Sequence, residues 1–172
     1  MIYIDGGFAF KNNKNDNVLV NAREQLLLPE RILISKIDVD QQVFNPSSKL
    51  VDDLDKELLK GVVRYPDSGL LGEKKNIFLF AHSTGFKVVK NQAFKAFNRL
   101  GELGSGDDVL LISEDTAYLY RVFSSNEVSA ETALIEFDNK DTLILSTCNT
   151  FGEQSARIIV RAKFIKKYQL AG

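Results

Sequence analysis

The sequence predicts a mainly β domain, a closed or nearly closed β-barrel that carries two or three short helices. About seven or eight short stretches rich in β-branched residues are separated by turn signals, and they dominate the second half of the chain. No internal repeat, linker or low-complexity block divides the 172 residues, a length that suits one domain. The composition, 44% hydrophobic and 26% charged, is that of a soluble globular protein.

Helical patterns interrupt the strands in the first half of the chain. Leu50, Leu54 and Leu58 recur at the spacing of one helix face, and Ser47 or Ser48 suits the cap in front of them. The expected elements, in order, are strands at 31–39 and 41–44, a helix at 47–61, a long loop at 62–75, a buried strand at 76–83 and a second helix at 91–101. In the second helix, Phe94, Phe97 and Leu100 would form one apolar face.

The C-terminal half of the chain is rich in predicted strands, whereas the N-terminal end contains a polar run without clear structure. Further strands are expected at 107–113, 116–125, 141–148 and 156–167. Near the start, "KNNKNDN" at 11–17 is a polar run without apolar side chains, which is typical of a loop or a disordered tether. We therefore expect a flexible N-terminal extension over 1–28 and a folded domain over 29–168.

Charge and cysteine content exclude some classes of protein and leave others open. The net charge of −1 implies no basic face and argues against nucleic acid as a partner. A single cysteine cannot form an internal disulfide, so it does not identify the compartment. No segment approaches the about 20 apolar residues that cross a bilayer, and the first residues make a poor signal peptide. The chain is therefore expected to be cytoplasmic or the soluble part of a longer protein.

The only cysteine, Cys148, and the only histidine, His82, each stand where an apolar strand gives way to a polar loop. Taken singly, they are explained as a buried structural thiol and a hydrogen-bonded histidine at a strand edge. Arg157 favours a catalytic role instead. A hairpin of the last two strands would bring this arginine opposite the cysteine, and a nearby cation favours the nucleophilic thiolate. Such a trio suits acyl transfer: the thiolate attacks a carbonyl, the imidazole protonates the leaving amine, and the guanidinium stabilises the oxyanion.

Five segments, in the same order, resemble the sortases, the cysteine transpeptidases of bacterial cell surfaces. "LSTC" at 145–148 is similar to the end of the sortase TLxTC signature, and "RIIVRAKF" from Arg157 is similar to the strand that follows it. "NIFLFAHST" is similar to the strand that delivers the sortase histidine, and "RILISKIDVDQQV" and "LLKGVVRYPDSGLLGEKKN" are similar to earlier segments of the family. Ile144, Ser35 and Leu71 depart from the family pattern, at positions away from the expected chemistry.

The resemblance implies an eight-stranded β-barrel and three catalytic roles. Cys148 would be the nucleophile, His82 the general acid and base, and Arg157 the stabiliser of the oxyanion or of the substrate backbone. Arg161 is a rival for the arginine role, although the family places its arginine at the start of this strand. The resemblance also implies an enzyme on the extracytoplasmic face of the bacterial cell membrane, held there by an anchor that this chain does not contain.

Sortases cut a C-terminal sorting motif similar to Leu-Pro-x-Thr-Gly after the threonine, and they join the acyl group to an amine of a cell-wall precursor or a pilin lysine. The resemblance therefore implies an apolar groove, with residues 124–140 as the loop that shapes it. Thr147 either lines this groove or is an ordinary β-former at the end of its strand. The other groove candidates are Ala81, Ser83, Val128, Ala130, Ala133, Leu134 and Ile135.

No cofactor is expected, and calcium is the one metal that the resemblance leaves open. Some sortases bind calcium through loop carboxylates, and about 6 to 8 oxygen ligands would have to converge. The carboxylates available are Glu102, Asp107, Asp108, Glu114, Asp115 and Glu131. Some pilus-building sortases carry an Asp-Pro-aromatic lid over the thiol; residues 1–28 have Asp5 and Phe8 but no such motif, so no lid is expected.

Three alternative functions stay open at this point. A thiol peptidase of the same fold would use the same residues and transfer the acyl group to water. An inactive barrel would bind sorting peptides without chemistry, although a pure binder has no need of all three residues. A cytoplasmic redox sensor built on Cys148 would form a sulfenic acid under mild peroxide.

Overall fold

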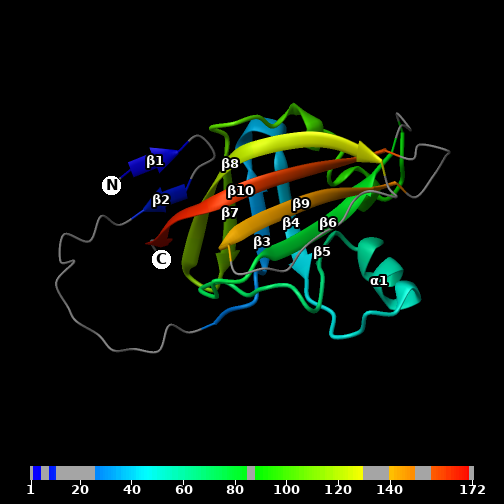
Figure 1. The fold of residues 1–172 in the computed structure, drawn as a ribbon, viewed down its shortest axis with the longest axis horizontal. Helices are drawn as coiled ribbons and strands as arrows, with labels where there is room; N and C mark the ends of the chain where they lie inside the picture. The colour runs from blue at the N-terminus through cyan, green and yellow to red at the C-terminus, as the bar shows by residue number, and fades with distance from the viewer. Residues whose placement is uncertain are drawn as a thin grey trace.

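The computed structural model describes residues 2–4, 8–10, 26–84, 88–129, 140–149 and 156–170. Eight strands close into a barrel in the order β10-β8-β7-β3-β4-β5-β6-β9, which confirms the predicted fold class (Figure 1). The parallel neighbours are β4 with β5 and β6 with β9, and the others pair antiparallel. The strands are β3 (Arg31–Ile34), β4 (Val39–Phe44), β5 (Val62–Arg64), β6 (Ile77–Ser83), β7 (Asp108–Ser113), β8 (Thr116–Ser129), β9 (Thr142–Asn149) and β10 (Ala156–Gln169).

The N-terminal residues form a sheet of their own. β1 (Ile2–Ile4) pairs antiparallel with β2 (Phe8–Phe10), outside the barrel sheet. The polar run at 11–17 lies outside the described residues. At the far end of the expected extension, Leu27 and Leu71 exchange two backbone hydrogen bonds of 3.1 and 2.9 Å. This bridge joins the chain to the barrel just before β3, and the division between residues 28 and 29 stays a prediction.

The strand predicted at 31–39 is wrong in one respect, because it is broken in the middle. A 3-10 turn, η1 (Ser35–Ile37), ends β3, and Asp38 then adopts a left-handed conformation with φ of 55°. Aspartate tolerates this region better than most residues, so the chain can reverse there. β3 and β4 consequently pair as an antiparallel hairpin, with Ile34 opposite Val39.

The loop predicted at 62–75 is also partly wrong, because its first three residues form β5. Val62 packs in the main core, whereas Val63 belongs to a second cluster on the outside of the barrel, so the strand is buried on both faces. Such a strand shows no alternation of apolar and polar residues, and three residues are too few to reveal one.

The helix predicted at 47–61 is confirmed as α1 (Val51–Leu58). Leu50, rather than a serine, is its N-cap residue, while the Ser48 hydroxyl accepts a hydrogen bond of 3.2 Å from the Leu50 amide and donates one of 2.6 Å to Asp53. Figure 1 shows α1 outside the barrel beside β5 and β6. There Leu58 and the partly buried Leu54 pack in one cluster with Val63 and Phe80.

The second predicted helix, at 91–101, is wrong in type: two 3-10 turns occupy the segment, η2 (Gln92–Lys95) and η3 (Leu100–Glu102). The cause is a tertiary hydrogen bond, since the Phe97 amide donates to the His82 carbonyl at 3.0 Å instead of to its own turn. Two of the three residues of the predicted apolar stripe, Phe97 and Leu100, are nevertheless fully buried in the main core.

The alternation of side chains along β6 explains where the site lies. Ile77, Leu79 and Ala81 belong to the main core inside the barrel, whereas Phe80 belongs to the outer cluster under α1. Because alternate residues of a strand face opposite sides, His82 shares the outer side with Phe80. Beyond α1, this outer side is covered by the segment that carries η2.

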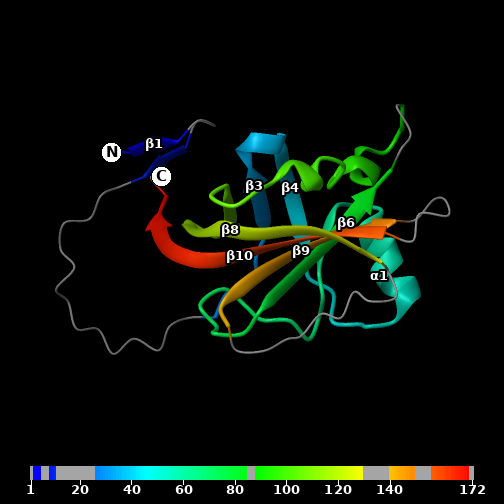
Figure 2. The same cartoon turned by 45° about the horizontal axis from the view of Figure 1, so that its top comes forward.

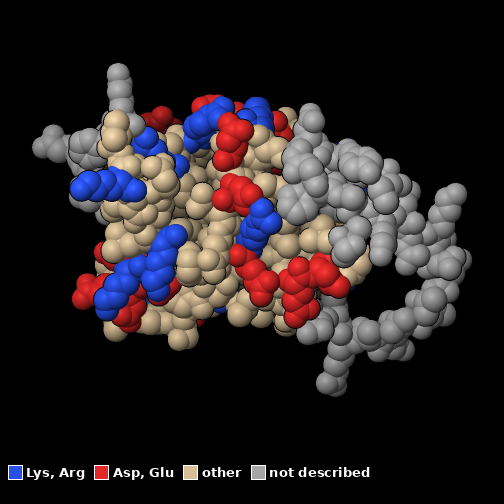
Figure 3. Space-filling model, turned by 180° about the vertical axis from the view of Figure 1, so that it is seen from behind, with Lys and Arg blue, Asp and Glu red and all other residues tan. Residues whose placement is uncertain are grey.

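Both signs of charge alternate among the described residues on the face shown in Figure 3, in keeping with the net charge of −1. Many of these groups pair at the surface, for example Arg121 with Asp108 at 2.8 Å. Within the described ranges, no helix has the length and hydropathy needed to cross a bilayer.

Arg64 is a buried cation whose loss should weaken the fold. Its guanidinium donates to the Ser68 carbonyl at 2.7 Å and to the Asn45 side chain at 3.0 Å, and burial lowers the pKa of the group. Arg64→Met leaves these acceptors unpaired, and we expect a loss of about 1.5–3 kcal/mol in the free energy of unfolding, measured by urea denaturation. Arg31→Met is the matched control, because its ion pair with Asp40 is exposed and is worth about 0–1 kcal/mol. Equal losses in the two variants would contradict this role for Arg64.

Candidate active site

The parallel pairing of β6 with β9 sets the candidate nucleophile beside the candidate base. In the register of these strands, Ala81 is the partner of Thr147, His82 of Cys148, and Ser83 of Asn149. Neighbouring strands lie about 4.8 Å apart, so the two backbones stand at the distance of adjacent strands. Figures 1 and 2 both show β6 and β9 running next to each other. Two residues far apart in the sequence, each unique of its kind, thus become neighbours in the sheet.

Arg157 enters from the other side of β9. β10 pairs antiparallel with β9, and the last matched pair is Ile159 with Ser146. The matched pairs of β9 and β10 end there, two residues after Arg157 and two residues before Cys148. Cys148 is thus in register with His82 on one side, and Arg157 lies near the start of the strand that pairs on the other side of β9. Arg161, the rival, pairs with Ile144, further from the end of the strand.

The Arg157 side chain has an unusual donor. Its Nε is buried and has no hydrogen-bond partner among the described residues, the only such buried side-chain atom in that part of the chain. Buried polar groups are nearly always paired, so an orphaned donor needs an explanation, and a ligand that supplies an acceptor is one. Arg157 lies near the start of β10, which pairs with the strand that carries Cys148.

His82 is almost completely buried, with 2% of its surface exposed. The ring of Phe94, on η2, lies against the imidazole with centroids 5.0 Å apart and planes inclined by 30°. The backbone carbonyl of His82 is held by the Phe97 amide, as described above. The strand end and the η2 segment therefore hold the imidazole from two sides.

The remaining predicted substrate residues fall into two groups. Ala81 is fully buried in the main core and offers no surface to a ligand in this structure, whereas Ser83 is half-buried at the end of β6. Thr147 is buried as well, and its substrate contact stays a prediction, as do those of Ala81 and Ser83. The loop predicted at 124–140 is wrong over its first residues, because β8 continues to Ser129, four residues beyond the strand predicted at 116–125. Ala130, Ala133, Leu134 and Ile135 lie outside the described residues.

The Thr147 hydroxyl joins β9 to β10 next to the site. Its Oγ1 accepts a hydrogen bond of 2.9 Å from the Ile158 amide, just beyond the last matched pair of the two strands. We expect Thr147→Val to cost about 1–3 kcal/mol of unfolding free energy, because the Ile158 amide loses its acceptor. Hydrogen exchange at Ile158 should accelerate, and Thr147→Ser should restore both properties. A valine variant as stable and as protected as the wild type would show that this bond contributes nothing.

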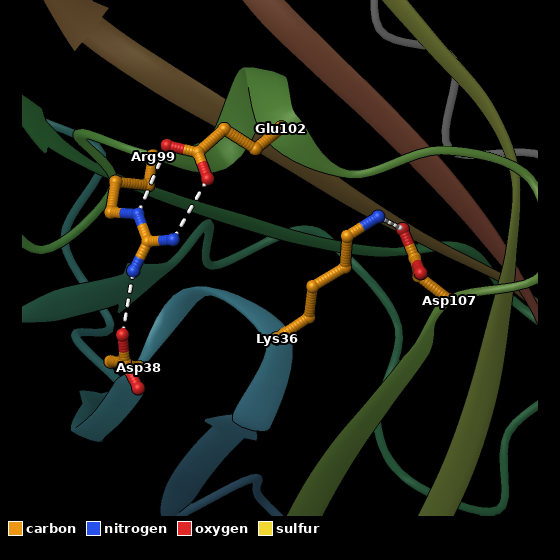
Figure 4. A network of polar contacts seen from close by, with 5 residues as sticks. All are labelled: Lys36, Asp38, Arg99, Glu102 and Asp107. Carbon is orange, nitrogen blue, oxygen red and sulfur yellow. Dashed lines mark hydrogen bonds and ion pairs between the residues drawn. The ribbon is translucent and has the colours of Figure 1, made fainter.

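The carboxylates considered for calcium are largely engaged with cations. Figure 4 shows Arg99 binding Glu102 at 2.8 Å and Asp38 at 2.6 Å, and Lys36 binding Asp107 at 2.7 Å. The hydrogen bond from Arg99 lowers the pKa of Glu102. Burial would raise the pKa of Asp107, but hydrogen bonds from Lys36 and the Gly104 amide outweigh it and lower the pKa.

Two of the other calcium candidates also have partners. Asp108 pairs with Arg121, and Asp115 accepts from the Thr116 hydroxyl. Glu131 lies outside the described residues. No cluster of three potential metal ligands occurs within the described ranges, and calcium binding stays untested.

Sequence reasoning missed the part played by the η2 segment at this site. It assigned Phe94 to an apolar stripe shared with Phe97 and Leu100, whereas the structure separates them: the last two enter the core and Phe94 meets His82. The split follows from the break between η2, which ends at Lys95, and η3, which begins at Leu100, and no pattern of apolar spacing indicates such a break.

Comparisons with known proteins agree with this architecture. A model of the Sortase domain matches residues 32–165. Sortase A of Listeria monocytogenes superposes with a TM-score of 0.63 at 21% identity, covering 86% of this chain and 92% of that one. A lid mutant of sortase A from Corynebacterium diphtheriae gives 0.64 at 23%, covering 84% and 73%. Sortase C of Streptococcus pneumoniae, a structure described with pilin substrate specificity, gives 0.63 at 23%, covering 87% and 72%. A search of curated proteins gives no match.

Proposed function

Because the chain belongs to the sortase family, we propose that it is a cysteine transpeptidase that cleaves a C-terminal sorting motif of the Leu-Pro-x-Thr-Gly type after the threonine and transfers the acyl group to an amine. One observation carries the proposal. It is the pairing of Cys148 with His82 across β6 and β9, beside the strand β10 that begins near Arg157, whose buried Nε has no partner among the described residues.

The first half of the proposed reaction forms a thioester. The Cys148 thiolate attacks the carbonyl carbon of the substrate threonine, and negative charge develops on the carbonyl oxygen. Arg157 donates a hydrogen bond to this oxygen or to the adjacent substrate backbone through its Nε, which has no partner among the described residues. His82 protonates the amine of the departing glycine, so that the peptide bond breaks and the acyl group stays on sulfur.

The second half reverses these roles. An incoming amine attacks the thioester while His82 accepts its proton, and the thiolate leaves as the new amide bond forms. The acceptor is an amine of a cell-wall precursor or a pilin lysine, and the donors are surface proteins that end in a sorting signal. We place the reaction on the extracytoplasmic face of the bacterial cell membrane.

Mass spectrometry tests the proposal directly. The protein is incubated with a library of sorting-type peptides, with and without an amine such as triglycine. An acyl adduct on the single cysteine, converted into an amine-ligated product, supports transpeptidation and identifies the motif. Hydrolysed product only, with the amine present, would favour a peptidase that transfers to water. A peptide that binds without forming an adduct would favour an inactive barrel.

A further inference from the structure

The segment that carries η2 is attached at three points around His82, one at the end of α1, one on β6 and one just beyond β6. The Asn91 side chain accepts from the Ala93 amide at 3.0 Å and donates to the Leu59 carbonyl at the end of α1 at 2.6 Å. The Phe97 amide donates to the His82 carbonyl at 3.0 Å. This arrangement fixes η2 both to α1 and to the strand residue whose ring it covers.

The third attachment lies just beyond His82. The Asn98 side chain accepts from the Thr84 amide at 2.8 Å and donates to the Thr84 carbonyl at 3.0 Å. Phe97 and Leu100 are fully buried and anchor the same segment in the main core. Phe94 lies between the attachment at Asn91 and those at Phe97 and Asn98, so the position of its ring is set by the fold and not by a mobile loop.

We propose that Phe94 is a positioning residue for His82: its ring, held by these attachments, fixes the plane of the imidazole and keeps water from the covered face. This inference rests on the proposed function, because a fixed imidazole plane matters only if His82 transfers protons. The ring centroids lie 5.0 Å apart, and the two planes are inclined by 30°. Rotation of the imidazole out of its plane would therefore have to displace the phenyl ring.

The proposed chemistry explains why such support is useful. His82 must reach the leaving amine in one step and the incoming amine in the next, and both proton transfers require hydrogen-bond geometry. A misplacement of about 1 Å at a catalytic group costs up to about 10²-fold in rate. An imidazole at the end of a strand, with a loop following it, needs neighbours to keep its rotamer. Phe94 supplies an apolar contact that does not compete for the imidazole nitrogens.

The single histidine makes the contact directly measurable. In the ¹H–¹³C NMR spectrum of protein labelled at histidine, the two ring C–H signals arise from His82 alone. A phenyl ring stacked on an imidazole shifts these protons upfield through its ring current. Phe94→Leu keeps an apolar side chain and removes the ring, so we expect both signals to move downfield. Phe94→Tyr should leave them near the wild-type positions. Unchanged signals in Phe94→Leu would overturn the contact itself, whatever the activity of the protein.

Kinetics with a sorting peptide tests the purpose of the contact. We expect Phe94→Leu to lower kcat about tenfold or more while KM changes little, since the ring touches the histidine and not the substrate. Phe94→Tyr should restore kcat. Phe123→Leu is the matched control, because Phe123 is half exposed on β8. An unchanged kcat in Phe94→Leu, or an equal loss in Phe123→Leu, would overturn the positioning role. Absence of peptide cleavage in the wild type would instead refute the proposed function, and the NMR shift would still report the contact.

Discussion

Replacing Cys148 with alanine is expected to lower acyl transfer by about 10⁴-fold or more, because the variant has no nucleophile to form the thioester. His82→Ala should lower kcat by about 10²–10⁴-fold, since it loses proton transfer to the leaving amine and from the incoming one. Both effects are measured as product formed from a sorting peptide, by chromatography and by the intact mass of the protein. Cys148→Ala should also lose the acyl adduct, because the chain contains no other cysteine.

The controls separate lost chemistry from lost structure. Both variants must retain a cooperative thermal unfolding transition, a condition that matters most for His82, which is 2% exposed. Cys148→Ser provides a nearly isosteric comparison, and it should be nearly as inactive as the alanine variant because a serine hydroxyl ionises far less readily than a thiol beside the same histidine and arginine. Product formation by Cys148→Ala would rule out the nucleophile. Wild-type kcat in His82→Ala would rule out the acid–base role.

The sequence singled out candidate residues for this site but did not reveal how they are arranged. Cys148 and His82 stood out because each follows an apolar strand and each is unique in the chain. Their adjacency depends on β6 and β9 being parallel neighbours in exact register, a non-local pairing between strands more than 60 residues apart that no local pattern contains. The hairpin of β9 and β10 was foreseeable from sequence order, because consecutive strands usually pair.

The errors in the fold have a common physical origin. β5 is three residues long and owes its conformation to β4 on one side and β6 on the other. The segment at 91–101 has apolar spacing typical of an α-helix, but hydrogen bonds to His82, Leu59 and Thr84 draw it into 3-10 turns. In both places tertiary contacts override local preference, and local preference is what a single sequence reveals.

Arg157→Lys should lower kcat about 10²–10³-fold although it preserves the positive charge. The reason lies in the Nε atom, a buried donor without a partner in the described part of the chain, because lysine has a methylene group at that place in its side chain. If Nε donates to the oxyanion or to the substrate backbone, lysine cannot replace it, and loss of one such donor costs about 2.7–4 kcal/mol of transition-state stabilisation. If only the charge near the thiol matters, lysine should suffice. Single-turnover kinetics of thioester formation measures the relevant step.

Arg161→Lys is the matched control, because Arg161 belongs to the same strand but pairs with Ile144, away from the end where Cys148 lies. It should keep wild-type kinetics. The reverse result, a large loss in Arg161→Lys beside an active Arg157→Lys, would transfer the role to the rival arginine and would leave the orphaned Nε unexplained. Losses of equal size in both variants would point to a general effect of the strand's charge and not to one hydrogen-bond donor. Only a loss confined to Arg157→Lys assigns the oxyanion contact to the buried Nε.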